Sequence, residues 1–261
     1  MTKREKLFEK ETDLCAAFLS ALPKGWTAYA ETGGWDILLV RDADGFQIGV
    51  EAKLRLNAEV ISQALEEYGT IGACSEGPDC RAVLVPLAES GSFDRIATYI
   101  GITVIRVSLA HGASFFAGKE RPRKWDIDPR LPTIDDRWTA DRWFEWCPTK
   151  RHRLPKYVPD VAAGSSAPVQ LTEWKIRAIK IVILAEVQGY VTRADFKHIG
   201  IDHRRWISAE GWLRPSEERG RYVTHGATPT GFREQHPRVY EEIKAEIEEW
   251  RPPTIEAGKM L

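Results

Sequence analysis

Three charged residues near the start of the chain have the types and spacing that suit activation of a water molecule by a metal ion. Asp36 lies at the beginning of the apolar run 35–40, and Glu51 and Lys53 lie two positions apart in the next apolar run. Carboxylate oxygens are the ligands that hard divalent cations prefer, and a lysine beside them orients or deprotonates a water. These residues therefore favour hydrolysis with Mg²⁺, or with Mn²⁺ bound by the same oxygens.

Alternation of apolar and polar residues predicts the strand that carries two of these side chains. One face of the expected strand 46–54 is apolar at every second position: Phe46, Ile48, Val50, Ala52 and Leu54. Glu51 and Lys53 belong to the opposite face. The continuous apolar character of 35–41 predicts a strand covered on both faces, where Asp36 needs a cation or hydrogen-bond donors. The turn 42–45 contains Asp-Gly, which favours a hairpin between the two strands.

Two further polar residues lie on helices that flank these strands. Residues 4–22 carry apolar side chains at helical spacing, and Glu11 falls in the middle of that apolar stripe. Glu11 is either a snorkelling or lysine-paired side chain or a residue that faces the same site as the two carboxylates. We favour the second interpretation, because an acid at the centre of a core-facing stripe is uncommon. After the strand, Asn57 is expected to cap a helix on which Gln63 lies at the edge of the apolar face.

The remaining elements of the first 110 residues complete an α/β pattern. Further strands are expected at 26–30, 81–87 and 102–107. The helix expected between the last two strands, 92–101, directs four apolar side chains inward: Phe93, Ile96, Ala97 and Ile100. A meander of strands followed by crossover helices predicts a mixed sheet flanked by helices.

The motif and its setting resemble the PD-(D/E)XK nuclease superfamily. The resemblance is carried by Asp36, then Glu51-Ala52-Lys53, with Glu11 on the preceding helix and Gln63 on the following one. It covers residues 1–110 and implies a restriction-endonuclease-like fold. Gly34-Trp35 stands where some members have a proline before the aspartate. The whole chain also resembles a poorly characterised bacterial and phage-associated group of PD-(D/E)XK phosphodiesterases.

This resemblance implies a role for each residue of the motif. The metal ligands that it implies are Asp36, Glu51, the carbonyl of Ala52 and, for a second ion, Glu11. Lys53 is expected to orient or deprotonate the attacking water and to offset phosphate charge. Gln63 is expected to position water or a phosphate. The implied function is metal-dependent hydrolysis of phosphodiester bonds in nucleic acid.

An ordinary structural explanation competes with this interpretation. Glu51 and Lys53 alone are explained as a same-face charge pair on a half-exposed strand, with Asp36 capping a turn. Asp36 in a buried run and Glu11 in an apolar stripe shift the balance towards a site.

Composition restricts the class of protein. The chain has 261 residues, of which 43% are hydrophobic and 29% charged, and no apolar run is long enough to cross a bilayer. The charged N-terminus lacks a following apolar signal region, which predicts a cytoplasmic protein. Four cysteines, at positions 15, 74, 80 and 147, suggest neither a disulfide framework nor a zinc site and are expected to be buried thiols.

Charge is distributed unevenly, although the net charge is only −1. Residues 1–110 contain 11 basic and 16 acidic side chains, as a metal site would require, whereas residues 111–168 contain 11 basic and 8 acidic ones. Residues 169–261 are balanced, with 15 and 14. This distribution of charge is only weak evidence for binding of nucleic acid.

Residues 111–168 are expected to form an irregular connector. Prolines recur through it, and tryptophans alternate with arginines. Such residues either stack on bases and hold phosphates or clamp the connector onto the first domain, and the second interpretation is favoured for most of the tryptophans. Within the basic run 149–156, Arg151 and Arg153 are candidates for phosphate contact, and a solvated basic linker explains the run equally well.

Residues 169–261 resemble a winged helix-turn-helix domain. Helices are expected from Leu171 to a stop at Gly189, over 192–198 and over 203–209, followed by a hairpin pairing 212–214 with 221–223 and a final helix over 238–250. His203, Arg204 and Arg205 are candidates for contact with a DNA groove. Domains of this kind also dock proteins.

The sequence thus predicts a metal-dependent deoxyribonuclease with a nuclease-like core, a connector and a winged-helix-like domain that binds or positions the substrate. DNA is the expected partner, and RNA is the alternative polymer. A different class of function stays open, in which a non-catalytic DNA-binding or adaptor protein keeps the nuclease core only as a scaffold.

Overall fold

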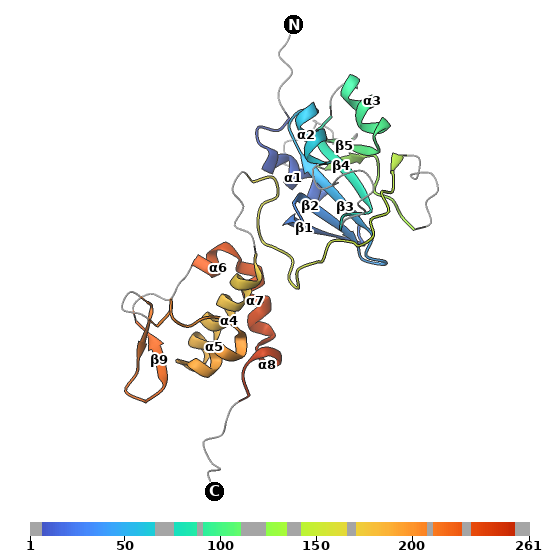
Figure 1. The fold of residues 1–261 in the computed structure, drawn as a ribbon. Helices are drawn as coiled ribbons and strands as arrows, with labels where there is room; N and C mark the ends of the chain where they lie inside the picture. The colour runs from blue at the N-terminus through green and yellow to red at the C-terminus, as the bar shows by residue number, and fades with distance from the viewer. Residues whose placement is uncertain are drawn as a thin grey trace. The chain divides into compact units, whose positions relative to one another are not determined.

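A computed structural model of the chain describes most of its residues. The described ranges are 7–65, 76–87, 91–110, 124–134, 142–165, 171–207, 211–225 and 231–253. The chain divides into two compact units, residues 1–168 and 169–261 (Figure 1). Among the described helices, none combines the length and the apolar character that a membrane span requires.

The first unit consists of one sheet with helices against it (Figure 1). Its elements in chain order are α1 (Glu11–Ser20), β1 (Trp26–Thr32), β2 (Trp35–Arg41), β3 (Gln47–Ala52), α2 (Ala58–Gln63), β4 (Cys80–Pro86), α3 (Ser92–Tyr99), β5 (Ile102–Leu109) and β6 (Trp125–Asp128). The mixed α/β architecture agrees with the sequence prediction.

The six strands follow one another across the sheet in chain order, β1 to β6. The meander β1–β2–β3 is antiparallel, β3–β4 and β4–β5 are parallel, and β6 is antiparallel to β5. Two tight turns fix the register of the meander, which pairs Thr32 with Trp35 and Ile37 with Val50. The sheet is therefore mixed, as the meander and crossovers predicted.

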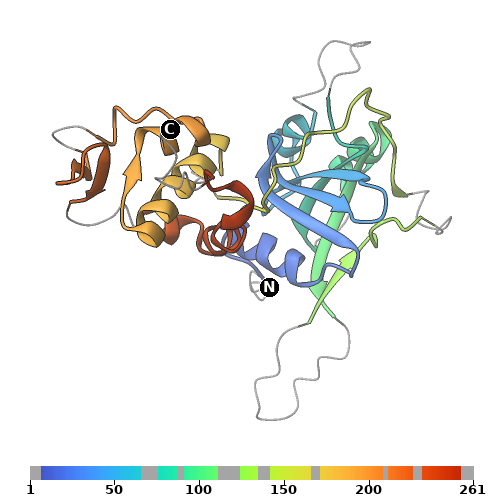
Figure 2. The same ribbon diagram turned by 90° about the horizontal axis from the view of Figure 1, so that it is seen from below.

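Helices cover both faces of this sheet (Figure 2). On one face, α1 packs Leu14 and Phe18 against residues such as Ile37 and Val50. On the other, α2 and α3 pack with Leu38 and the neighbouring strand residues. Strand β2 packs apolar side chains into the cores on both sides of the sheet, which explains its continuous hydrophobic run.

The first helix is shorter than predicted. The sequence pattern suggested a helix over 4–22, but within the described residues α1 starts at Glu11, and residues 7–10 are not helical. The carboxylate of Asp13 accepts the N–H of Lys10 at 3.3 Å and so satisfies a donor in front of the first turn. Glu11 is consequently the first residue of the helix and not the centre of its apolar stripe.

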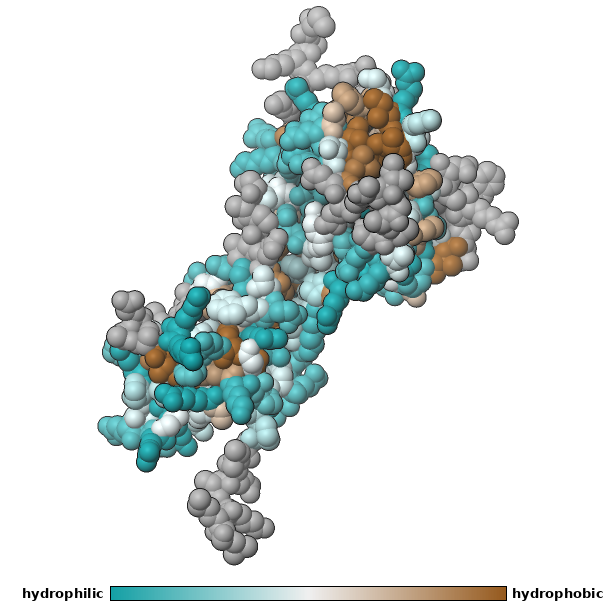
Figure 3. Space-filling model, viewed as in Figure 1, coloured by the Kyte–Doolittle hydropathy of each residue, from teal (hydrophilic) through white to brown (hydrophobic). Residues whose placement is uncertain are grey.

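Helix α3 buries less than its apolar pattern predicted. Ala97 is fully buried and Ile100 packs partly against the same core, but Ile96 is 47% exposed and Phe93 lies at the surface. The prediction that all four side chains point inward is wrong, because the helix meets the sheet along a narrow stripe. Apolar side chains gather on the surface of the region where α3 lies (Figure 3).

The segment predicted as an irregular connector belongs to the first unit. Strand β6 extends the sheet, and isolated bridges join Glu76 to Lys150 and Cys80 to Glu145. Trp143 is buried in the core beneath α1, and the indole N–H of Trp146 donates to the carbonyl of Gly101 at 3.0 Å. These two tryptophans fasten the segment to the first unit, as the favoured interpretation predicted, while β6 shows that the segment is not irregular throughout.

The described cysteines differ in burial. Cys15 and Cys80 are buried free thiols, as predicted, whereas Cys147 is exposed. The exposed position contradicts the expectation for Cys147, whose backbone has a positive φ of 46°. Cys74 lies outside the described residues.

The second unit combines helices with a small sheet. Its elements are α4 (Glu173–Gln188), β7 (Val191–Thr192), α5 (Arg193–Ile199), β8 (Leu213–Pro215), β9 (Arg221–Thr224), α6 (Gly231–Gln235), α7 (Pro237–Ala245) and α8 (Ile247–Trp250). The strand order is β7–β9–β8, with antiparallel pairs. Gly189 ends α4 with a φ of 78°, and Thr192 caps α5, as the sequence predicted.

Two helices of the second unit differ from the prediction. The helix expected over 203–209 is a turn within the described residues, where the N–H groups of Trp206 and Ile207 both donate to the carbonyl of His203. The final helix is divided at Glu246 into α7 and α8. Residues 208–210 lie outside the described part of the chain.

Candidate functional site

The two carboxylates of the motif lie opposite each other on neighbouring strands. Pairing of Ile37 with Val50 places Asp36 across from Glu51 at the end of the β2–β3 ladder. Lys53 follows directly after β3, and its N–H donates to the carbonyl of Leu84 at 3.0 Å, which keeps its backbone against β4. Adjacent strands therefore bring Asp36, Glu51 and Lys53 to one end of the sheet.

The carboxylate of Asp36 is held by the sheet itself. Its Oδ2 accepts the N–H of Ala52 at 2.8 Å, so the side chain satisfies a backbone donor at the end of β3. Burial raises the pKa of Asp36 above its usual value, and the Ala52 N–H and the charge of Lys53 lower it in part. The Ala52 N–H thus fixes the orientation of the Asp36 carboxylate, and Lys53 offsets its charge only in part. The group of Ala52 that contacts Asp36 is its N–H.

Glu11 reaches the same end of the sheet from α1. Its Oε1 lies 3.7 Å from Nζ of Lys53, and the two side chains are about one-third and one-quarter exposed. Glu11 is thus paired with a lysine, as the ordinary interpretation allowed, and that lysine is Lys53 of the motif, so Glu11 also faces the predicted site. As the first residue of α1 it also lies where the helix dipole stabilises an anion.

A fourth carboxylate, Glu31, joins the site and was not predicted as a site residue. Glu31 lies opposite Asp36, between the pairs Ala30–Ile37 and Thr32–Trp35. Its pKa is raised by burial and then by the charge of Asp36, and it is lowered by the N–H groups of Ser165 and Gly164. The signal was present in the sequence: a two-residue Gly33-Gly34 turn pairs position 31 with position 36.

The buried thiol of Cys15 interacts electrostatically with all of these acids. Burial raises its pKa first, and the charges of Asp36, Glu31, Glu11 and Glu51 raise it further, in that order. The charges of all four carboxylates therefore raise the pKa of this one buried thiol. We call Glu11, Glu31, Asp36, Glu51 and Lys53 the acidic end of the sheet.

Gln63 does not join this group in the described structure. It is the last residue of α2, a helix whose buried residues Val60 and Ile61 belong to the core on the face opposite α1. No hydrogen bond connects Gln63 with any described residue of the acidic end. The prediction that Gln63 positions water or phosphate has no support in these contacts.

Within the ranges that the structure describes, no three His, Cys, Asp or Glu side chains are arranged as a ready-made metal cage. The donor set of the acidic end nevertheless fits a hard cation: it consists of carboxylate oxygens, and the charge of Asp36 raises the pKa of Glu31. Mg²⁺ is usually held by one or two carboxylates together with waters and substrate phosphates. Asp36 and Glu51 are the residues that meet this requirement.

The basic candidate Arg151 contacts the other end of the same hairpin, at the turn between β2 and β3. Its Nε lies 2.7 Å from Oδ2 of Asp79, and it donates to the carbonyl of Asp44 at 2.9 Å. Arg41 donates to both carboxylate oxygens of Asp44, and this hydrogen-bonded pairing lowers the pKa of Asp44 to about 2. We call Arg41, Asp44, Asp79 and Arg151 the paired end.

These contacts assign a structural role to part of the basic run. Lys150 pairs with Glu76 at 3.1 Å, and Gln47 exchanges two hydrogen bonds with the backbone of His152. Arg153 has an exposed side chain, while its N–H donates to Glu76. The run therefore fastens the chain to the sheet, and Arg153 is the candidate whose charged group remains at the surface.

In the second unit, the predicted groove contacts lie in a turn. Arg204 and Arg205 are exposed, and the carboxylate of Asp202 accepts the N–H of Arg204 at 2.9 Å. His203 is partly buried against the ring of Phe196. Two of the three candidates thus present their charges to solvent from a turn that Asp202 fixes.

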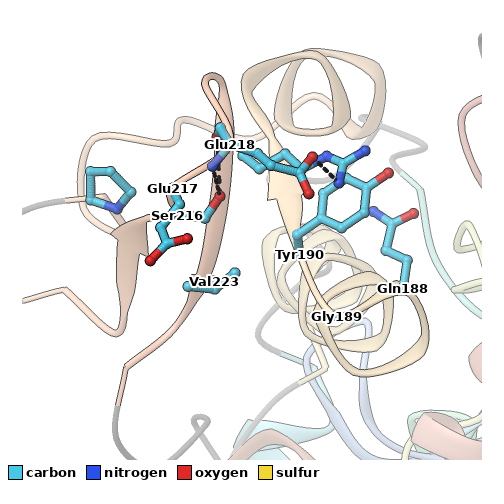
Figure 4. A pocket seen from close by; sticks show the side chains of 9 residues that line it. Gln188, Gly189, Tyr190, Ser216, Glu217, Glu218 and Val223 are labelled. Carbon is cyan, nitrogen blue, oxygen red and sulfur yellow. Dashed lines mark hydrogen bonds and ion pairs between the residues drawn. The ribbon is translucent and has the colours of Figure 1, made fainter. Parts of the chain in front are cut away.

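A pocket of about 530 Å³ lies between the end of α4 and the β8–β9 hairpin (Figure 4). Glu218 forms an ion pair with Arg221, whose guanidinium lies 4.1 Å from the ring centroid of Tyr190. Glu217 lines the same pocket. Of the arginines in this hairpin, Arg221 is therefore paired with a carboxylate of the same hairpin.

Comparisons with known proteins yield no matching family model, curated protein or solved structure.

Proposed function

We propose that this protein is a metal-dependent nuclease that hydrolyses phosphodiester bonds of DNA at the acidic end of its sheet. The observation that carries the proposal is the placement of Asp36 opposite Glu51, with Lys53 directly after the same strand. The charges of four carboxylates act on the buried thiol of Cys15, and burial raises the pKa of two of them, Asp36 and Glu31, so a bound cation would stabilise this end of the sheet. The proposed fold assignment is restriction-endonuclease-like, on the basis of the mixed sheet and the position of the motif.

The proposed roles follow from the contacts of each residue. Asp36 and Glu51 would hold Mg²⁺ or Mn²⁺, which when bound lowers the pKa of a coordinated water and offsets phosphate charge. The Ala52 N–H fixes the orientation of the Asp36 carboxylate. As an ammonium group held beside Glu11 by the 3.7 Å contact, Lys53 would orient the attacking water; in its neutral amine form it would accept the proton of that water.

We also propose that the second unit binds or positions the nucleic acid, as a winged-helix-like module. The sequence of helices followed by a β8–β9 hairpin supports this assignment. Arg204 and Arg205 are the proposed phosphate contacts, because their side chains are exposed and their turn is fixed by Asp202. The neutralised Arg221 is not included.

The test is cleavage of linear, supercoiled and single-stranded DNA, and of RNA, in the presence of Mg²⁺ or Mn²⁺. We expect Lys53→Ala to reduce the cleavage rate by roughly 100-fold or more, the effect typical of losing a group that transfers protons. Lys24→Ala is the matched control, because Lys24 is an exposed lysine of the same unit. Cleavage that survives Lys53→Ala unchanged would contradict the role of Lys53.

A further inference from the structure

The segment 161–165, which we call the strap, passes directly against the acidic end. Ala163 is 3% exposed and Val161 packs partly against the core beneath α1, so both anchor the strap to the first unit. Gly164 adopts a φ of +71° and approaches α1 closely. A Cβ atom at this position would lie 3.0 Å from Sγ of Cys15 and 3.4 Å from the backbone carbon of Glu11.

Glu31 connects the strap to the sheet. The N–H of Ser165 donates to Oε1 of Glu31 at 3.3 Å, and the N–H of Gly164 also lowers the pKa of this carboxylate. Successive N–H groups around a left-handed residue form a concavity that binds anions, and here the anion is a side chain of the protein itself. One carboxylate thus interacts with the N–H groups of two residues of the strap.

The backbone of Glu31 is itself unusual. Its φ is +51°, a left-handed value that side chains with a Cβ atom rarely adopt, although Gly33 and Gly34 follow two and three positions later. Such conformations persist where surrounding contacts determine them, and they gather at functional sites. The contacts that hold Glu31 are those with the strap and its place opposite Asp36.

We propose that Glu31 is a positioning residue: by binding Gly164 and Ser165 it holds the strap against the first turn of α1 and thereby keeps Glu11 beside Lys53. The strap is then one wall of the acidic end, and Cys15 is sealed beneath it. This inference rests on the proposed function for its meaning in catalysis, but its geometry is testable without any cleavage activity.

Alkylation of Cys15 measures whether the strap is in place. The full-length chain with Cys74→Ser and Cys147→Ser retains two buried thiols, Cys15 under the strap and Cys80 on β4, which serves as the internal reference. N-ethylmaleimide is added under native conditions, and peptide mass spectrometry follows each cysteine separately.

We expect Glu31→Ala to increase the rate of Cys15 alkylation at least about tenfold, while Cys80 stays unchanged, because only local opening exposes Cys15. Glu31→Gln keeps an acceptor oxygen for the strap and should stay within about twofold of the parent. Gly164→Ala should open the strap without removing a charge, since its Cβ would press on Cys15. Glu59→Ala removes an exposed acid of α2 and serves as the control without effect.

An unchanged Cys15 rate in both Glu31→Ala and Gly164→Ala, or a parallel rise at Cys80, would overturn the proposal. Cleavage separates it from the proposed function. If the parent chain cleaves DNA, Glu31→Ala should lower kcat with little change in KM, and Glu31→Gln should restore it. If the parent chain cleaves nothing while the alkylation pattern holds, the strap stands and the nuclease assignment fails.

Discussion

The carboxylates at the two ends of the β2–β3 hairpin differ in their ion pairing and in the direction of their pKa shifts. At the paired end, Asp44 and Asp79 each lie 2.7 Å from an arginine, and the pKa of Asp44 falls to about 2. At the acidic end, burial dominates and raises the pKa of Asp36 and Glu31, and Nζ of Lys53 lies 3.7 Å from the carboxylate of Glu11.

We infer that the carboxylates of the paired end stabilise the folded chain, whereas those of the acidic end destabilise it. A carboxylate with a close cation and backbone donors contributes stability, whereas buried like charges reduce it and are retained where function requires them. The same two strands carry both ends, so the sheet does not explain why the carboxylates differ in pKa. The difference comes from the cationic side chains that lie close to the carboxylates at each end.

The largest expected effect on stability lies at the paired end. Asp79 accepts the Gln47 N–H at 2.7 Å and pairs with Arg151, and its side chain is only 14% exposed. Asp79→Ala removes the acceptor of the Gln47 N–H and the carboxylate that pairs with Arg151, and should lower the free energy of unfolding by about 2–3 kcal/mol, as measured by urea denaturation. Glu145→Ala removes an exposed acid of the same unit and should change it by less than about 0.5 kcal/mol. Equal effects would remove the contrast between the ends.

A smaller effect of opposite sign is expected at the acidic end. Asn keeps the oxygen that accepts the Ala52 N–H but removes the charge, so Asp36→Asn should raise the free energy of unfolding at neutral pH by about 0.5–2 kcal/mol. Because the pKa of Asp36 is raised in the folded protein, the wild-type chain loses stability as the pH rises from the usual aspartate value through the raised one.

The gain from Asp36→Asn should therefore disappear in acid, below the usual pKa of about 3.9 for aspartate. Thermal unfolding of both proteins across the pH range measures this difference. A loss of stability at neutral pH would mean that the carboxylate is better paired than the contacts of Asp36 indicate.

Sequence patterns predicted much of this arrangement because local periodicity encodes it. Alternation located β3, the Asp-Gly turn fixed its pairing with β2, and these two facts placed Asp36 near Glu51. Glu31 was missed because the first strand was predicted to end at residue 30, whereas β1 extends to Thr32. A two-residue Gly-Gly turn gives the register that the structure has.

Other features depend on contacts that periodicity does not encode. The role of Arg151 is decided by Asp79, 72 positions away in the chain, and the sixth strand lies in a segment that prolines made look irregular. Helix α3 has a helical apolar stripe, yet Ile96 remains exposed because no described element covers it. Residues 203–207 form a turn although Asp202 supplies a helix-like cap.

Metal binding tests the central contrast most directly. Mn²⁺ is titrated by calorimetry into the wild-type chain, a double variant of the acidic end, Asp36→Asn with Glu51→Gln, and a matched variant of the paired end, Asp44→Asn. We predict saturable binding to the wild type and to Asp44→Asn, and its loss in the double variant. The same isotherm for all three proteins, or no binding to any, would contradict the account and favour a non-catalytic scaffold.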